Sequence, residues 1–160
     1  MWYSSTDGQY IQDGQSFTID GVQYPPQWLN QATPEQKAEV GLEEVVATNS
    51  PENDQFYWVS TELNKASLTY VNTPKDLDTC KANQVSATNG AAYSILLPSD
   101  WMVVKAIETG STVPANWNAW RQSIRQQAAD YVTVITACTT IEQLAALPPV
   151  QWEPNPDMGQ

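Results

Sequence analysis

Carboxylates are the side chains of this sequence best suited, by their number, to catalysis. The chain has 18 Asp and Glu residues and no histidine, so the commonest general base and metal ligand is absent. Two carboxylates flanking a glycosidic bond would suffice for a glycan hydrolase, and the closest pairs are Glu43–Glu44 and Asp76–Asp78. Glu43 and Glu44 are adjacent on a predicted strand, so their side chains face opposite ways. Asp76 and Asp78 lie in the first turn of a predicted helix, where the helix dipole favours acidic side chains without any catalytic role. We therefore expect no catalytic residue and no enzymatic activity.

Binding motifs for a cofactor or a metal ion are also missing. P-loop, GxGxxG, GxSxG and paired CxxC patterns do not occur, and the acids of an Asp-Gly repeat near the N-terminus are too widely spaced for a calcium loop. Cys80 and Cys138 lie on predicted helices, where a small thiol packs well. We expect no cofactor and no metal, and favour buried free thiols over a disulfide or a reactive cysteine.

Negative charge narrows the choice of partners. The net charge is -11, and residues 1–62 hold ten of the acids but one base. Such a chain repels phosphate backbones and anionic lipid. No run approaches 18 apolar residues, and the N-terminus lacks the pattern of a signal peptide. We expect a protein that starts in a cytoplasm, binds no nucleic acid and does not insert into a membrane.

Residues 1–50 are predicted to form a small β-rich module with one short helix. Three Asp-Gly pairs, at residues 7, 13 and 20, separate runs rich in β-forming residues, and Asp-Gly is a strong hairpin signal. Thr33 is a candidate N-cap for a helix from Pro34, Gln36 completes a capping box, and Gly41 can end the helix. Residues 42–46 then return to a strand.

A central β-hairpin is predicted for residues 51–72. The segments QFYWVS, residues 55–60, and SLTYVN, residues 67–72, alternate with strand periodicity on either side of a polar turn around Asn64. Large aromatic side chains would occupy both faces of this hairpin. We therefore expect another part of the structure to cover at least one face.

Helices are predicted for residues 73–148. The run Thr73 to Asp76 repeats the capping pattern and starts a helix that reaches about Leu97, although small residues and Asn89–Gly90 should weaken or kink it. A second helix begins at Trp101 and stops at Gly110.

The C-terminal part completes this helical unit. Pro114 opens the last long helix, whose apolar residues recur in steps of three and four, and Thr139–Thr140 can cap a last short helix. Residues 149–160 are an extended, proline-rich tail in which Trp152 is an anchor. The predicted fold class is α+β, with an N-terminal module of small hairpins, a central hairpin and a C-terminal unit of three to four helices.

The sequence contains seven tryptophans and seven tyrosines, and the search for catalytic and metal-binding groups leaves them without a role. Such residues are enriched at interface hot spots, so they favour binding to another protein. Filling small cores is the alternative for each, and it is favoured for Trp117 and Trp120. The candidate partner-binding residues are Trp2, Tyr24, Trp28, Trp58, Trp101, Val104, Trp117, Trp120, Ile124, Tyr131 and Trp152.

Two segments carry a resemblance to known proteins. AYSILLPSDWMVVKAIETGSTVPANWNAWRQSIR, followed by ACTTIEQLAALPPVQWEPNPD, resembles the bacteriophage tail assembly chaperones, also named tail fibre assembly proteins. The match runs from about Ala91 to Leu147 and consists of turns and anchors. GVQYPPQWLNQATPEQKAEVGLEEV, Gly21 to Val45, is similar to a small module of phage tail-associated proteins, with Gln36 in place of a glutamate. The central hairpin has no place in the resemblance.

The resemblance implies a helper that binds the tail fibre trimer during assembly in the host cytoplasm. Fibre strands pair between chains, so edges and apolar surface stay exposed until three chains meet. The alternative is a permanent structural or adhesin subunit that remains in the virion tail and contacts host surface glycan. Self-association is a further expectation, and a glycan hydrolase is the least favoured hypothesis.

Overall fold

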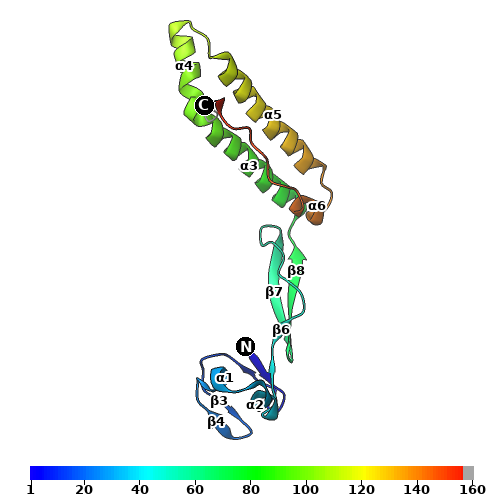
Figure 1. Cartoon of the computed structure of the whole chain (residues 1–160). Coiled ribbons are helices and arrows are strands. Elements are labelled where there is room, and N and C mark those ends of the chain that lie inside the picture. Colours follow the sequence, from blue (N-terminus) through cyan, green and yellow to red (C-terminus); the bar gives the residue numbers. More distant parts are fainter. Residues whose placement is uncertain (157–160) are drawn as a thin grey trace. The chain divides into compact units, whose positions relative to one another are not determined.

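The fold is mixed α and β, as the sequence predicts, in a computed structural model that describes residues 1–156 (Figure 1). The chain divides into two compact units, Met1–Thr73 and Pro74–Gln160, which we name unit 1 and unit 2. The domain boundaries predicted at residues 50 and 148 are not tested by this division and remain predictions. The last four residues of the predicted tail lie outside the described residues.

Short antiparallel strands build the first part of unit 1. Strand β1 (Trp2–Ser4) pairs with β2 (Tyr10–Ile11) on one side and with β5 (Leu42–Glu44) on the other. Strands β3 (Phe17–Ile19) and β4 (Val22–Tyr24) form a separate hairpin. Its two-residue turn is Asp20–Gly21, with φ of 49° and 75°. The Asp-Gly signal is confirmed there because this tight turn requires positive φ.

Two short helices lie between β4 and β5. Helix α1 (Trp28–Gln31) precedes α2 (Pro34–Glu39), and α2 has the predicted capping box. The Gln36 amide donates to Thr33 Oγ1 at 3.3 Å, and the Thr33 amide donates to Gln36 Oε1 at 2.9 Å. Gly41 then turns the chain with φ of 73°, and a Cβ at this position would lie 2.5 Å from Thr6 Oγ1.

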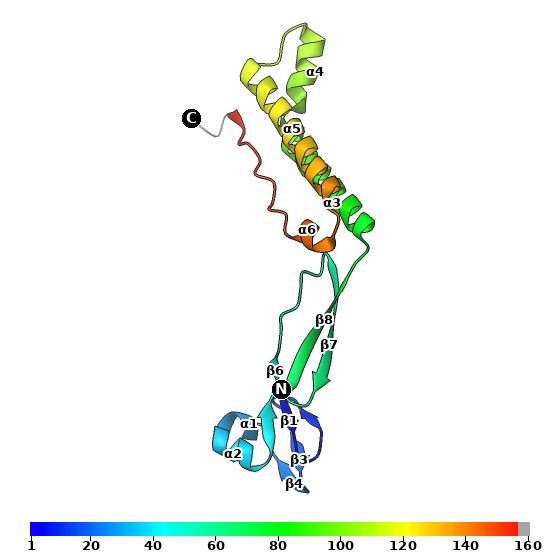
Figure 2. The ribbon, with the colours of Figure 1, turned by 90° about the vertical axis from the view of Figure 1, so that its right-hand side faces the viewer.

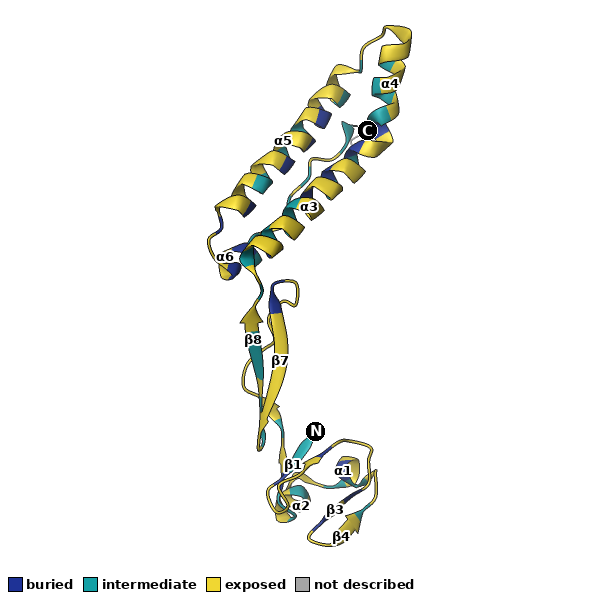
Figure 3. Cartoon of the chain, turned by 180° about the vertical axis from the view of Figure 1, so that it is seen from behind, coloured by how far each residue is buried: buried dark blue, intermediate teal, exposed yellow. Residues whose placement is uncertain are grey.

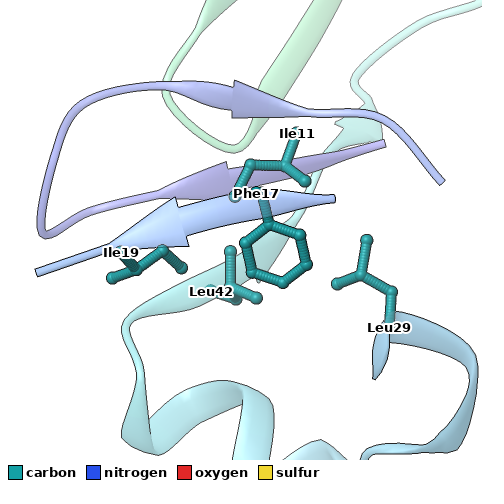
Figure 4. Close-up of a cluster of buried hydrophobic side chains, with 5 residues drawn as sticks. All are labelled: Ile11, Phe17, Ile19, Leu29 and Leu42. Atoms are coloured by element: carbon teal, nitrogen blue, oxygen red, sulfur yellow. The ribbon is translucent and has the colours of Figure 1, made fainter. Parts of the chain in front are cut away.

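A small hydrophobic core joins these strands and helices (Figure 4). Fully burying an aliphatic or aromatic side chain contributes about 1.5–3 kcal/mol, so a few such residues can hold a small module together. Partly buried side chains, Trp28 among them, pack around this cluster. The buried members are Ile11, Phe17, Ile19, Leu29 and Leu42.

The rest of unit 1 is a three-stranded sheet in the order β6–β8–β7. Strand β6 (Val46–Ala47) runs parallel to β8 (Ser67–Pro74), which is joined to β7 (Tyr57–Asn64). The turn is at Lys65–Ala66 rather than around Asn64, and Lys65 has φ of 53°. The expectation of a covered face is wrong for β7, where every residue after Tyr57 is exposed.

Helix α3 (Leu77–Leu96) opens unit 2. Its N-cap is Asp76 rather than Thr73, because the Asp76 carboxylate accepts from the Thr79 amide at 2.8 Å while β8 continues to Pro74. The helix is continuous through Asn89–Gly90, and the expected weakness or kink there remains a prediction. Its small residues allow close packing, since Thr88 and Ala92 are buried.

Three further helices follow. A 3₁₀ turn at Leu97–Ser99 leads into α4 (Asp100–Thr109), which ends at Gly110 with φ of 66°. Helix α5 (Ala115–Ala137) follows Pro114, and α6 (Ile141–Ala145) is capped by Thr140 as predicted.

The core of unit 2 lies between α3 and α5, which run side by side in Figures 1 and 2. The extended segment after α6 lies along the same pair of helices. Cys80 and Cys138 are buried free thiols, as the sequence predicts. No helix within residues 1–156 has the length and apolar character to cross a membrane. The core residues are Ala92, Leu96, Trp120, Ile124 and Ala128.

Candidate docking surfaces

Helix α4 is the most unusual element of unit 2 because it contributes no buried residue (Figure 3). Trp101, Val104 and Ile107 are exposed by 57%, 53% and 79%. Met102, Val103 and Ala106 on the remaining sides are intermediate in burial. One side of α4 is therefore partly covered, while the side that carries Trp101, Val104 and Ile107 is apolar and open to solvent.

A buried arginine fixes the start of α4 to α5. Arg121 is 5% exposed and donates from Nη1 to the Leu96 carbonyl at 3.1 Å and to Ser99 Oγ. Its Nη2 donates to Asp100 Oδ1 at 2.6 Å. Ser99 Oγ in turn donates to the Leu96 carbonyl at 2.7 Å. This network holds the junction of α3 and α4, while the rest of α4 keeps its apolar side chains exposed.

Arg121 was missed among the candidate residues of the sequence. A signal was present, since Arg121 follows Trp117 by four residues and precedes Ile124 by three, so it falls on the apolar stripe of α5. A charged residue on such a stripe needs a partner, because an unpaired buried charge is strongly unfavourable. The Pro-Ser-Asp run before Trp101 supplies that partner.

Ile124 and Trp120 lie in the core, which corrects the choice of Ile124 as a docking residue and, for Trp120, agrees with the alternative that the sequence favours. Ile124 is completely buried and Trp120 is 6% exposed, because both lie on the side of α5 that faces α3 and the tail. Trp117 is half-buried, with its ring centroid 5.4 Å from that of Trp120. These side chains stabilise unit 2 and present little surface to a partner.

The tail occupies one groove of the helical pair. Trp120 Nε1 donates to the Glu153 carbonyl at 2.9 Å, and the Tyr131 hydroxyl donates to the Pro148 carbonyl at 2.7 Å. Trp152 packs on the core, as its predicted role as an anchor requires. Tyr131 and Trp152 therefore make contacts inside the chain.

A second groove, of about 480 Å³, lies between α3 and α5. Buried Ala92, Leu96 and Ala128 are among its lining residues, and so are the exposed Tyr93 and Arg125. Its shape and lining permit contact with an apolar segment, but no cluster of reactive groups lies in it.

The aromatic candidates of the N-terminal module are half-buried and paired with neighbours. Trp2 Nε1 donates to Asp13 Oδ1 at 3.0 Å, and Lys37 Nζ lies 4.3 Å from the centroid of the Trp2 ring. Tyr24 and Trp28 make an edge-on contact with centroids 4.8 Å apart. These contacts hold the strands and helices of the module together.

Strand β7 carries a strongly exposed aromatic residue of unit 1. Trp58 is 67% exposed, and Val59 and Leu63 are also exposed. Three of the predicted binding residues are clearly accessible in the structure, namely Trp58, Trp101 and Val104. Val59, Leu63 and Ile107 were not predicted, although the alternation of β7 and the many apolar residues of α4 are visible in the sequence.

Unit 1 is strongly acidic. Up to Thr73 the chain has ten acids, with Lys37 and Lys65 as its bases. A hydrogen bond from the N-terminal amine, at 3.1 Å, is the main cause that lowers the pKa of Asp13. Hydrogen bonds from the Thr79 hydroxyl and amide lower the pKa of Asp76. These acids have structural roles at a chain end and a helix cap.

A metal-binding geometry does not arise among residues 1–156. No group of three or more Cys, Asp or Glu side chains in this part of the chain is placed to hold a metal ion. Comparisons with protein-family models, with curated proteins and with solved structures give no match to this chain. What the surfaces can do chemically is bind apolar and aromatic groups of another molecule.

Proposed function

We propose that this protein is a tail fibre assembly chaperone of a bacteriophage, and that it acts by binding the fibre polypeptide without catalysis. The observation that carries the proposal is α4, a helix that buries none of its residues and leaves Trp101, Val104 and Ile107 more than half exposed. The segment that resembles the chaperone family includes the whole of α4. Binding would take place in the host cytoplasm while the fibre trimer assembles.

The docking surface in this proposal is the α4 surface, defined by Leu97, Trp101, Val104 and Ile107, all at least half exposed. An unassembled fibre chain exposes apolar surface and unpaired strand edges, which favour aggregation. Aromatic and branched side chains on a helix can cover such surface, with large contact area per residue. The buried Arg121 network supports the α4 surface by fixing the first turn of the helix.

Co-expression with the tail fibre polypeptide of the same virus tests this proposal. We expect the wild-type chain to raise the yield of soluble trimeric fibre and to co-purify with it. Replacing Trp101, Val104 and Ile107 together by serine should abolish both effects, because the apolar contact area is lost. Val134→Ser is the matched control, since Val134 is an exposed apolar residue on α5.

Two results would count against the proposal. One is a fibre that reaches the same soluble yield with the triple variant as with the wild type. The other is a stable wild-type chain that never binds the fibre polypeptide. Mass spectrometry of purified virions then separates the chaperone from the permanent subunit, since a released chaperone is missing from the particle.

A further inference from the structure

Strand β7 has one occupied edge and one open edge. Within residues 1–156, β8 is the strand hydrogen-bonded to it, and the sheet order places β7 at the end. The other edge of the central strand β8 is filled, because β6 pairs with β8 and the chain continues along it. There, the Thr48 amide donates to the Leu68 carbonyl at 2.8 Å, and the Tyr70 amide donates to Asn49 Oδ1 at 2.8 Å.

The open edge lacks the features that normally prevent edge-to-edge pairing. Natural edge strands are protected by lysine, proline, bulges or short length. From Trp58 to Leu63 the strand has a single charged residue, Glu62, and no proline or lysine. The strand is eight residues long, and Val59 and Leu63 are exposed apolar residues on it. The sheet has three strands and leaves β7 exposed after Tyr57, so a further strand would add to its stability.

We propose that β7 pairs antiparallel with β7 of a second copy of this chain, joining two three-stranded sheets into one. Such an interface is isologous, with its two-fold axis near Ser60 and Thr61, the middle of the strand. Pairing about this axis places the Glu62 of each copy opposite the first half of the other strand rather than opposite its own counterpart. Like charges are thereby kept from facing each other directly.

Charge complementarity at the two ends of β7 favours a second copy as the occupant. The turn that follows β7 contains Lys65, and the segment that precedes β7 contains Asp54. Antiparallel pairing brings the end of one strand to the beginning of the other, so Lys65 of each copy approaches Asp54 of its partner. This attraction occurs twice in the symmetric pair, in a unit that has few other bases.

Charged substitutions at Thr61 test the pairing. Thr61 is exposed and lies near the axis, so Thr61→Lys places two lysines close together in a dimer, and Thr61→Glu places two glutamates there. The matched control is Thr69→Lys, an exposed threonine on β8, whose outer edge is already occupied. Sedimentation velocity on the isolated full chain, from about 1 µM to about 1 mM, measures the dimer dissociation constant.

The wild type and Thr69→Lys should both dimerise as concentration rises. Thr61→Lys and Thr61→Glu should each raise the dissociation constant by at least about tenfold. Mixing these two variants should restore a dimer, because opposite charges then meet at the axis. That restoration also shows that the variants remain folded.

Three results would overturn the pairing: a wild-type chain that is monomeric throughout the range, Thr61 variants that dimerise as well as the wild type, or a mixture that fails to restore the dimer. Trp101→Ala should leave dimerisation unchanged, since α4 takes no part in it. The inference does not rest on the proposed function, because the test contains no fibre protein.

Discussion

Helices α4 and α5 are neighbours in the chain and both carry many apolar residues, but they differ in what covers them. Helix α5 packs against α3 and the tail and buries Trp120 and Ile124, whereas α4 buries none of its residues. In α5 the apolar residues form a buried stripe, whereas in α4 they include Trp101, Val104 and Ile107, which stay exposed beside a half-buried side. A buried stripe is satisfied inside a small unit, but the exposed apolar side of α4 has no covering element in unit 2.

Truncating a core residue of α5 should lower the free energy of unfolding more than any other change considered for the two helices. Ile124 is completely buried, so Ile124→Ala should lower the free energy of unfolding by about 2–5 kcal/mol through lost burial and a cavity. Urea unfolding, followed by the far-ultraviolet circular dichroism of the helices, measures the change. A loss below about 1 kcal/mol would mean that α5 is not the centre of the core.

Removing the arginine that joins the two helices should have the next largest effect. Arg121→Ala deletes three hydrogen bonds and leaves the Leu96 carbonyl and Ser99 without this donor, so we expect a loss of about 2–4 kcal/mol. Arg125→Ala is the matched control, because Arg125 is exposed on the same helix. Equal unfolding free energies for the two variants would contradict a structural role for Arg121.

Helix capping gives a smaller, pH-dependent contrast. Asp76 caps α3 through Thr79, whereas Ser99 makes no side-chain cap bond at α4. The pKa of Asp76 is lowered in the folded chain, so its ionised carboxylate stabilises the fold above the unfolded pKa, and this contribution disappears as pH falls through the folded pKa.

Asp76→Asn keeps a capping side chain without the titration. The melting temperature of this variant should lie slightly below that of the wild type at pH 7, and the difference should shrink and vanish as pH falls through the lowered pKa of Asp76 in the folded chain. A difference that persists unchanged in acid would show that the charge of Asp76 plays no part.

The smallest effect on stability should come from α4 itself. Trp101 is largely exposed, so Trp101→Ala should change the free energy of unfolding by no more than about 0.5 kcal/mol. Recovery of the fibre complex should nevertheless fall. If the variant unfolds as readily as Ile124→Ala, Trp101 is a core residue and the contrast between the helices fails.

Local signals in the sequence predicted most of the secondary structure. The Asp20–Gly21 turn, the Thr33 capping box and the stop at Gly110 each depend on neighbouring residues, and the structure has all three. The start of α3 at Asp76 was missed because two capping patterns, at Thr73 and Asp76, overlap in the sequence. Tertiary pairing decided between them, since β8 extends through Thr73 to Pro74.

Burial of individual aromatic residues could not be predicted from local patterns. Trp101 and Trp120 occupy similar helical contexts in the sequence, yet one is exposed and the other is in the core. What separates them is the path of the tail and the position of α3, which are long-range properties. The buried Arg121 network was within reach, because a charged residue on an apolar stripe is a visible exception.

Hydrogen exchange of the α4 amides, with and without the tail fibre polypeptide, tests the central claim most directly. In the free chain we expect α4 to exchange faster than α5, because α4 lacks buried contacts. In the complex, exchange in α4 should slow strongly while exchange in α5 stays nearly the same. Unchanged exchange in α4 in the presence of saturating fibre polypeptide would contradict the account.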